Sequence, residues 1–272
     1  PAEGDILSEK YRLEEILGRG GFGVVFRATH LEMDRSVAIK TLLPQSMGDD
    51  AAAQRFRREA ILASSLTHPN SITLFDYGQT QEGLLYLVME LLRGKTLKQE
   101  LKNCGALEID RATSITVQVL KSLAEAHKQG IIHLDLKPEN IFLCEVPGES
   151  DFVKVLDFGV ARMIADASGS EDLSASLAIG TPKYMSPEQI TGEPVAAATD
   201  IYALGLIAWE MVMGKPAFQG RTPLEIVAKQ VSHQVQDLSS GFKTTALGAM
   251  IDRSICKNPS DRFDNAGQAL EH

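Results

Sequence analysis

The chain has 272 residues, with 27 Lys and Arg against 36 Asp and Glu, so its formal net charge is −9. This acidic balance argues against nucleic acid as the main partner, because phosphate backbones attract clustered positive charge. Three cysteines, Cys104, Cys144 and Cys256, lie far apart without metal or redox spacing, as is typical of a reducing cytosol. The longest apolar stretch, 201–209, is too short to cross a bilayer, and no signal peptide is present. We therefore expect a soluble, cytoplasmic piece of protein without direct membrane contact.

Residues 11–43 are predicted to form strands joined by tight turns, with a G-x-G-x-x-G-x-V pattern at 18–25. A dinucleotide-binding turn would require a helix directly after the glycines, and a Walker loop would require Gly-Lys-Ser/Thr. The glycines are followed instead by β-branched and aromatic residues (24–28), a polar turn (32–35) and a second apolar run (36–40). The order of strand, turn and strand favours a hairpin that covers phosphate groups.

A helix is predicted over 54–62, because this segment is rich in helix formers and can present an apolar face. Glu59 is its only acid. This carboxylate is a candidate partner for Lys40, although it could instead offset Arg55 and Arg58 on a solvated face.

The remaining elements follow in chain order. Strands are predicted at 72–77 and 84–90, followed by a linker at 91–94 in which Gly94 forms a joint. Helices are predicted at 97–103 and 110–129, the second ending at Gly130. The small, polar and acidic segment 165–176 is predicted to be a mobile loop.

The polar residues that indicate chemistry lie in two short stretches, His-Leu-Asp-Leu-Lys-Pro-Glu-Asn at 133–140 and Asp-Phe-Gly at 157–159. Phosphoryl transfer requires a carboxylate that orients a hydroxyl, a cation near the moving phosphate, and oxygen ligands for Mg²⁺. Asp135, Lys137, Asn140 and Asp157 supply these groups in that order. The two stretches therefore indicate phosphoryl transfer.

With the glycine-rich pattern and Val-Ala-Ile-Lys at 37–40, these stretches resemble the eukaryotic-like protein kinase superfamily, in particular the catalytic domain of bacterial Ser/Thr protein kinases. The resemblance implies an α+β, two-lobed protein kinase fold. A small β-rich N-lobe with one main helix would span about 8–90, a hinge about 90–94, and a larger, mostly helical C-lobe about 95–272. Residues 1–272 would form one kinase domain, a fragment of a longer protein.

The resemblance also implies a role for each candidate residue. Asp135 and Lys137 are the catalytic pair, and Asn140 and Asp157 are the metal ligands. The expected ATP-binding residues are Leu17, Gly18, Gly20, Gly23, Val25, Ala38, Lys40, Glu59, Met89, Glu90, Leu92 and Phe142.

Further residues are expected to brace the site. The resemblance places the end of the activation segment at 180–188, where Thr181 would help to pair Asp135 with Lys137. Glu188 would form a buried ion pair with Arg262, and Asp200 would hold the backbone of the catalytic loop.

Leu134 departs from the family pattern, which usually has Arg before the catalytic Asp. That Arg ordinarily binds a phosphorylated residue of the activation loop through charge-assisted hydrogen bonds, and Leu134 cannot. Activation-loop phosphorylation is therefore not expected to be strictly required; the less favoured alternative is that Leu134 is a tolerated packing residue. Ser168, Ser170, Ser174 and Ser176 are the available serines.

The function expected from the resemblance is transfer of the ATP γ-phosphate to Ser/Thr hydroxyls of proteins in signal transduction, with autophosphorylation. The expected cofactors are ATP and Mg²⁺, or Mn²⁺ in its place, and the expected partners are protein substrates and a second copy of the chain. A scaffold without activity would usually lack Lys40, Asp135, Asn140 or Asp157, and all four are present. A small-molecule kinase would lack the long segment ending in Pro-Glu and the run Lys-Pro-Glu-Asn at 137–140, and both are present. The domain could be cytoplasmic or the cytosolic part of a membrane-anchored protein.

Overall fold

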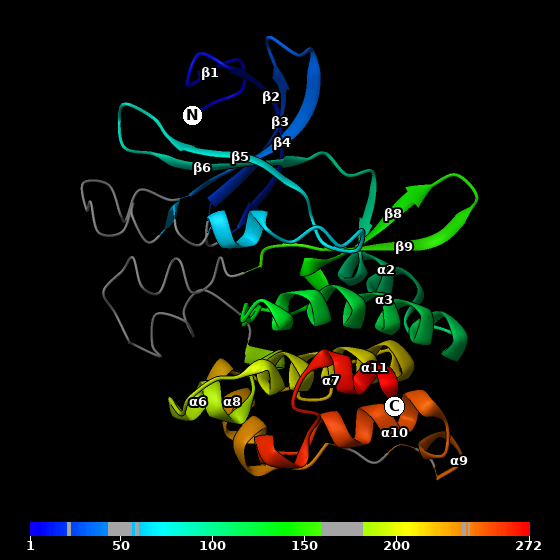
Figure 1. The fold of residues 1–272 in the computed structure, drawn as a ribbon. Coiled ribbons are helices and arrows are strands. Elements are labelled where there is room, and N and C mark those ends of the chain that lie inside the picture. Colours follow the sequence, from blue (N-terminus) through cyan, green and yellow to red (C-terminus); the bar gives the residue numbers. More distant parts are fainter. Residues whose placement is uncertain (21–22, 43–55, 58–59, 159–181, 236–237, 239) are drawn as a thin grey trace. The chain divides into compact units, whose positions relative to one another are not determined.

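Strands dominate the first part of the computed structural model and helices the rest (Figure 1). The structure describes residues 1–20, 23–42, 56–57, 60–158, 182–235, 238 and 240–272. Within these, the chain forms two compact units: the first contains described residues of 1–67 and 72–93, and the second 68–71, 94–158 and 182–272. Each unit is described by itself below.

The first unit is built on a six-stranded antiparallel sheet with the order β1-β2-β3-β4-β6-β5. Its strands are β1 (Ile6–Leu7), β2 (Tyr11–Gly20), β3 (Gly23–His30), β4 (Arg35–Leu42), β5 (Leu74–Gln79) and β6 (Leu85–Glu90). The strands β2 and β3 form the glycine-rich hairpin predicted from the sequence, with Gly20 paired to Gly23.

The two faces of this sheet have different roles, because successive side chains of a strand point to opposite faces. One face carries the larger apolar core, in which Phe26, Ile39 and Val88 are almost fully buried. The other face packs Leu42 and Leu87 against apolar residues of the helical segments 56–57 and 60–64. Lys40, two residues before Leu42 on β4, belongs to this second face.

The second unit is mostly helical. Its helices are α2 (Leu97–Cys104), α3 (Ile109–Lys128), α6 (Pro187–Thr191), α7 (Ala197–Met213), α8 (Pro223–Ser232), α9 (Ser240–Lys243), α10 (Ala246–Ser254) and α11 (Ala266–Glu271), with 3₁₀ turns η2 (Pro138–Asn140), η3 (Pro182–Tyr184) and η4 (Pro259–Asp261). A small antiparallel sheet adds β7 (Gly94–Thr96), β8 (Ile141–Val146) and β9 (Glu149–Val155) in that order.

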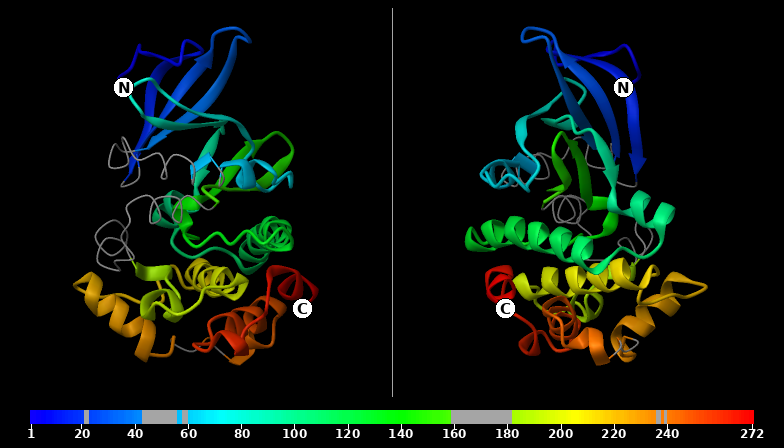
Figure 2. Two further views of the ribbon diagram at one scale, coloured as in Figure 1. Left: turned by 60° about the vertical axis from the view of Figure 1, so that its left-hand side comes forward. Right: turned by 90° about the vertical axis from the view of Figure 1, so that its right-hand side faces the viewer.

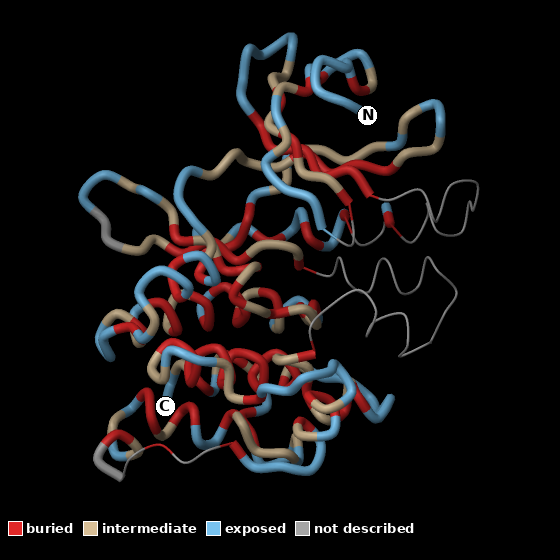
Figure 3. The backbone as a smooth tube through the Cα atoms, turned by 180° about the vertical axis from the view of Figure 1, so that it is seen from behind, coloured by how far each residue is buried: buried red, intermediate tan, exposed pale blue. Residues whose placement is uncertain are grey.

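Helix α7 is the centre of the second unit, and α3, α10 and α11 pack against it. Nearly every residue of α7 is buried, as expected for a helix that is apolar on all sides. Helix α3 buries one stripe, including Ile115, Val119 and Leu123, and Figure 2 shows it running beside α7. Figure 3 shows the buried residues of this unit gathered where these helices meet.

Residues 68–71 join the second unit although their neighbours in the chain belong to the first. The Asn70 side-chain nitrogen donates to the carbonyl of Val153 at 2.7 Å and to Oε1 of Gln118 at 3.1 Å. The Asn70 carbonyl accepts from the Val155 amide at 2.7 Å, and Ser71 forms a parallel bridge with Val155. These contacts attach the segment to β9 and α3.

Gly94, the predicted joint at the end of the linker 91–94, also has a structural role in the small sheet. It is the first residue of β7 and pairs with Cys144. A Cβ atom at this position would lie 2.1 Å from the Leu143 carbonyl oxygen, and the φ angle is +138°. Glycine is therefore required here by the close approach of β8 and by a left-handed backbone. In the parts of the chain that the structure describes, no helix is long and apolar enough to span a membrane.

Candidate active site

Asp200, in the first turn of α7, holds the backbone of the loop between α3 and β8. Its Oδ2 accepts the His133 N–H at 2.8 Å and its Oδ1 accepts the Leu134 N–H at 2.9 Å. Nε2 of His127 on α3 lies 2.9 Å from the same Oδ2. Asp200 is only 1% exposed, so its charge is stabilised by these donors, as a buried carboxylate requires. This confirms the brace predicted for Asp200.

His133 is fully buried and joins the loop to residues 156–158. Its Nδ1 accepts the Asp135 N–H at 3.3 Å, so the proton lies on Nε2, which donates to the Leu156 carbonyl at 2.8 Å. Its ring packs against that of Phe158, with 4.9 Å between centroids. The Asp157 region is thereby held to the loop that carries Asp135.

Leu134 and Asp157 both adopt left-handed backbone, with φ of +66° and +60°. This region is uncommon for residues other than glycine and costs of order 1–3 kcal/mol at each position. Such strain persists only where neighbouring contacts determine the conformation, and it gathers at functional sites. Of the six described residues other than glycine with a positive φ, these two stand in the two stretches that indicate phosphoryl transfer.

The loop brings three polar side chains together. Lys137 Nζ lies 2.6 Å from Asp135 Oδ2, and the Asn140 side-chain nitrogen donates to the Asp135 carbonyl at 2.8 Å and to Oδ2 at 3.3 Å. The 3₁₀ turn η2 produces this arrangement, since it folds Asn140 back toward Asp135. Because the amide nitrogen is directed at Asp135, the amide oxygen is the atom that would ligate a cation. The cluster holds a carboxylate, an ammonium group and a hard oxygen donor within six consecutive residues.

The sequence-predicted ATP residues of the first unit lie mainly on one face of its sheet. Lys40 is directly opposite Val25 on β3, and Ala38 is directly opposite Met89 on β6. Directly opposed residues of antiparallel strands point to the same face, and so do residues two apart on one strand. These four side chains therefore share the face opposite the larger core. Lys40 is 7% exposed.

The three glycines of the hairpin are not equivalent. Gly23 has a φ of +151°, and a Cβ there would lie 1.8 Å from the Thr41 carbonyl oxygen, so the fold itself requires glycine. Around Gly18 and Gly20 no atom lies within 4 Å of the position a Cβ would take. Packing does not require glycine at those two positions. Leu17, just before them, is 48% exposed.

The remaining predicted ATP residues are partly buried. The Glu90 N–H donates to the Thr73 carbonyl at 3.0 Å, and the Glu90 carboxylate accepts the Thr73 N–H at 2.8 Å. Leu92 follows β6 and is half-buried, and so is Phe142 on β8 in the second unit. The predicted partner of Lys40, Glu59, lies outside the described residues, and so do Thr181 and the four serines.

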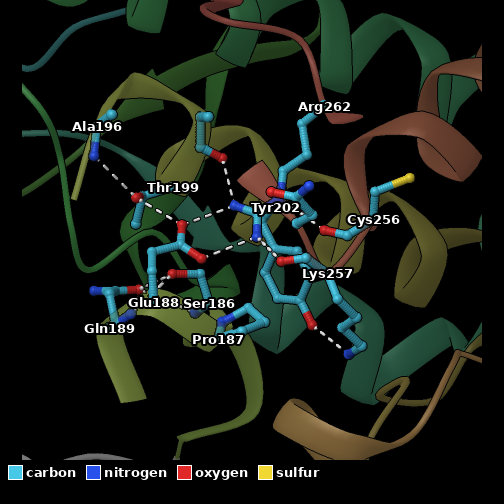
Figure 4. Close-up of polar contacts among 12 residues, drawn as sticks. Ser186, Pro187, Glu188, Gln189, Ala196, Thr199, Tyr202, Cys256, Lys257 and Arg262 are labelled. Atoms are coloured by element: carbon cyan, nitrogen blue, oxygen red, sulfur yellow. Dashed lines mark hydrogen bonds and ion pairs between the residues drawn. The ribbon is translucent and has the colours of Figure 1, made fainter. Parts of the chain in front are cut away.

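A buried ion pair fixes the helix that follows the predicted activation segment (Figure 4). Arg262 Nη1 and Nη2 donate to the two carboxylate oxygens of Glu188 at 2.7 and 2.9 Å, as the sequence predicted. Thr199 donates to the same carboxylate at 2.9 Å. Burial raises the pKa of Glu188, but the hydrogen bonds and charge of Arg262 outweigh it and leave the pKa below its usual value. The carboxylate is therefore ionised in the folded protein.

Sequence reasoning missed several polar contacts of this region. Gln189 Nε2 donates to the Leu134 carbonyl at 2.8 Å. The buried Gln230 of α8 donates to the carbonyls of Pro182 and Lys183 at 3.3 and 2.6 Å. Glutamines follow no recognisable pattern, so the sequence held no signal for these two contacts.

A third missed contact joins Tyr184 to Glu210. The Tyr184 hydroxyl donates to Oε2 of Glu210 at 2.5 Å. Burial raises the pKa of Glu210. The position of this acid, at the end of the apolar stretch 201–209, was the one available signal.

Comparison with known proteins gives consistent results. The family model described as "Protein kinase domain" matches residues 11–272. The chain is 38% identical over 264 residues to the serine/threonine-protein kinase pkn3 of Myxococcus xanthus, covering 95% of this chain and 48% of the relative. It is 38% identical over 267 residues to the serine/threonine-protein kinase PknB of Mycolicibacterium smegmatis, covering 96% of this chain and 42% of the relative.

Among solved structures, the kinase domain of Mycobacterium tuberculosis PknI is similar, with a TM-score of 0.75 and 25% identity. That match covers 100% of this chain and 96% of the PknI chain. The chain thus spans less than half the length of the two curated relatives and nearly all of a solved domain.

Proposed function

The chain belongs to the protein kinase family, and from that premise we propose that it transfers the γ-phosphate of ATP to serine and threonine hydroxyls of proteins. Family, fold class and serine/threonine type agree with the predictions from the sequence. The roles of the individual residues are part of the proposal. The cluster of Asp135, Lys137 and Asn140 is the observation that carries it.

In the proposed step, the hydroxyl oxygen of the substrate bonds to the γ-phosphorus, the bond from that phosphorus to the bridging oxygen of ADP breaks, and Asp135 accepts the hydroxyl proton. Lys137, 2.6 Å from Asp135, is close enough to stabilise the negative charge on the phosphoryl oxygens. Asn140 and Asp157 would hold Mg²⁺, or Mn²⁺ in its place, through side-chain oxygens. When bound, the metal ion neutralises charge on the nucleotide phosphates.

The nucleotide would be bound mainly by the face of the first sheet that carries Lys40. Lys40, supported by Glu59, would contact the α- and β-phosphates, and Gly18, Gly20 and Gly23 would let the hairpin backbone approach them closely. The open space around Gly18 and Gly20 supports this role, because the packing of the unit does not explain the glycines. The apolar residues expected at the adenine are Leu17, Val25, Ala38, Met89 and Phe142.

The polar edge of the adenine would meet the backbone between Glu90 and Leu92. Since the Glu90 N–H already donates to Thr73, we assign the Glu90 carbonyl as the acceptor and the Leu92 N–H as the donor. This assignment predicts that side-chain changes at Glu90 alter nucleotide affinity less than changes at Ala38 do.

The proposal is tested by separating binding from turnover. Asp135→Asn should lower the rate of transfer by about 10²–10⁴, the usual contribution of a general base, while nucleotide affinity stays within about twofold of wild type. Lys40→Met should instead weaken nucleotide binding as well as turnover. Equal turnover in wild type and Asp135→Asn would contradict the assignment of Asp135.

We also propose that the domain phosphorylates itself and does not strictly require phosphate on its activation loop, since Leu134 cannot bind such a phosphate. Replacing Ser168, Ser170, Ser174 and Ser176 together by alanine should leave most of the turnover on a protein substrate. Loss of most activity in that variant would contradict the proposal. The work of the domain would take place in the cytoplasm, either free or as the cytosolic part of a membrane-anchored protein, with pairing of two copies during autophosphorylation.

A further inference from the structure

Gln189 connects the helix after the activation segment to the residue that precedes Asp135. We propose that Gln189 is a positioning residue of the phosphoryl-transfer reaction, which it supports by holding the peptide between Leu134 and Asp135. This inference rests on the proposed function, because it assigns Gln189 a task in the geometry of the same reaction. It concerns a side chain on α6 that contacts the loop backbone and has no part in the cluster around Asp135.

The peptide group before Asp135 is held at both of its polar ends. The Leu134 carbonyl accepts from Gln189 Nε2 at 2.8 Å, and the Asp135 N–H donates to His133 Nδ1 at 3.3 Å. The orientation of this peptide determines the direction in which the Asp135 side chain leaves the backbone. A shift of about 1 Å in a catalytic group can cost about 10²-fold in rate. The orientation of this one peptide should therefore have a large effect on the rate of phosphoryl transfer.

Leu134 needs such support because its backbone is strained. Its φ of +66° is unfavourable for a residue with a branched side chain, and relaxation to an ordinary φ would rotate the following peptide. Two hydrogen bonds oppose that rotation, one from the Leu134 N–H to Asp200 and one from Gln189 to the Leu134 carbonyl. Leu134 lies outside the helices and strands, and among the described residues no backbone N–H donates to this carbonyl.

Gln189 is itself held in the orientation that this contact requires. Its Oε1 accepts the Ser186 N–H at 3.1 Å and lies 3.3 Å from the Ser186 hydroxyl, in a capping box at the start of α6. With the oxygen directed at Ser186, the amide nitrogen is directed at the loop. The neighbouring Glu188 is tied to Arg262, so α6 is a rigid base for the contact.

The contact also explains how the chain could work with leucine before the catalytic aspartate. In relatives with arginine at that position, a phosphate on the activation loop connects the loop to this residue through charge. Here a side-chain amide from α6 binds the backbone of the same residue, and neither partner carries a charge. The end of the activation segment is therefore coupled to Asp135 without a phosphate.

The capping and positioning contacts of Gln189 use different atoms, so one substitution separates them. Gln189→Glu keeps an oxygen acceptor for Ser186, which is the residue a capping box commonly uses, and removes the donor to Leu134. It also places a carboxylate oxygen against the Leu134 carbonyl. The expected result is a decrease of about tenfold to a hundredfold in kcat, with less than about twofold change in the KM for ATP.

Gln99 supplies a matched control, because it occupies the same position in the capping box of α2. Its Oε1 accepts the Thr96 N–H at 2.8 Å, and its backbone N–H donates to the Thr96 hydroxyl at 3.2 Å. Gln99 bonds Thr96 within its own cap, while the neighbouring Lys98 pairs with Glu139 of η2. Gln99→Glu therefore makes the same chemical change at a helix start without removing a donor to residues 134 and 135. It should leave kcat unchanged, and the two variants should have similar Tm values.

A second variant guards against an effect through stability alone. Ser186→Ala weakens the cap of α6 but leaves the amide donor of Gln189, so it should lower Tm with little loss of kcat. The proposal is overturned if Gln189→Glu has the kcat of Gln99→Glu, or if Ser186→Ala loses as much kcat as Gln189→Glu at the same loss of Tm.

Hydrogen exchange decides the inference without any reliance on phosphate transfer. The backbone amides of 134–136 should exchange at least about tenfold faster in Gln189→Glu than in wild type or Gln99→Glu, because the loop opens more often. Unchanged exchange would overturn the inference. A wild-type protein that transfers no phosphate would instead contradict the proposed function, so the two failures are distinguishable.

Discussion

Removing the negative charge of Glu188 should destabilise the second unit strongly. The Arg262 side chain is 0% exposed and that of Glu188 is 2% exposed. All five N–H groups of this guanidinium have acceptors: the two carboxylate oxygens of Glu188 and the carbonyls of Ala198, Cys256 and Lys257. Glu188→Gln would leave the buried guanidinium of Arg262 without its counter-charge. The glutamine amide would direct either its NH₂ group or its single oxygen at that guanidinium.

The expected cost is about 3–5 kcal/mol, the usual value for removing one partner of a buried pair. A domain of this kind has a total unfolding free energy of about 5–15 kcal/mol, so the loss is a large fraction. Buried pairs can often be replaced by apolar residues without cost. Here the double variant Glu188→Leu, Arg262→Met would leave three carbonyls without donors, at about 1–3 kcal/mol each, so it should still lose about 3–9 kcal/mol.

Urea denaturation followed by tryptophan fluorescence measures this cost. Trp209 is the only tryptophan in the chain, lies on α7 and is 1% exposed, so it reports on the unit that contains the pair. Glu225→Gln is the control, because Glu225 pairs with Lys229 at 2.8 Å on an exposed face of α8. That change should cost far less, because solvent screens an exposed pair. A double variant as stable as wild type would refute the expected cost of leaving three carbonyls without donors. A Glu188→Gln variant as stable as the Glu225→Gln control would refute the expected cost of breaking the buried ion pair.

Two further predictions concern a glycine and a half-buried lysine. Gly23→Ala should lower Tm, because the new Cβ would lie 1.8 Å from the Thr41 carbonyl oxygen. Gly18→Ala should leave Tm unchanged and raise the KM for ATP, because no atom lies within 4 Å of its Cβ position. Equal losses of Tm in the two variants would contradict this contrast. Burial, with the nearby charge of Arg262, lowers the pKa of Lys257 from 10.5 to about 8. Between these values the unfolded chain binds more protons, so stability rises with pH across the window and is constant below it. The unfolding free energy of wild type minus that of Lys257→Met should therefore increase from about pH 7.5 to about pH 10, and a difference independent of pH would contradict the lowered pKa.

The parts of the site that could be predicted from the sequence are those fixed by local chain geometry. Asp135, Lys137 and Asn140 lie within one 3₁₀ turn and its approach, so their spacing alone brings the side chains together. The ion pair of Glu188 and Arg262 spans 74 residues, and only the resemblance to a known family predicted it.

The features that escaped prediction depend on packing between distant segments. Leucine is a poor candidate for left-handed backbone, so nothing in the sequence marks Leu134 as strained. Its contact with Gln189 joins residues 55 apart and uses a carboxamide, a group that occurs throughout the chain without pattern. Similarly, Gly94 was predicted to be a joint, and the requirement for glycine became visible only when β8 was placed beside it.

The strand boundaries show the same limit. A strand was predicted at 72–77, whereas β5 runs from Leu74 to Gln79. Residues 72–73 lie between β5 and the segment 68–71, which belongs to the second unit, and a register shift between Leu74 and Asp76 separates the two stretches of pairing with β6. Apolar periodicity locates a strand, but contacts with other segments decide where it begins.

The most direct test of the account is phosphate transfer from ATP in the presence of Mg²⁺, onto the protein itself and onto a generic basic protein, beside the Asp135→Asn variant. The wild-type reactions should yield phosphoserine and phosphothreonine, and the variant almost none. Nucleotide binding without transfer by the wild-type protein, or equal transfer by the two proteins, would contradict the assignment of an active kinase centred on Asp135.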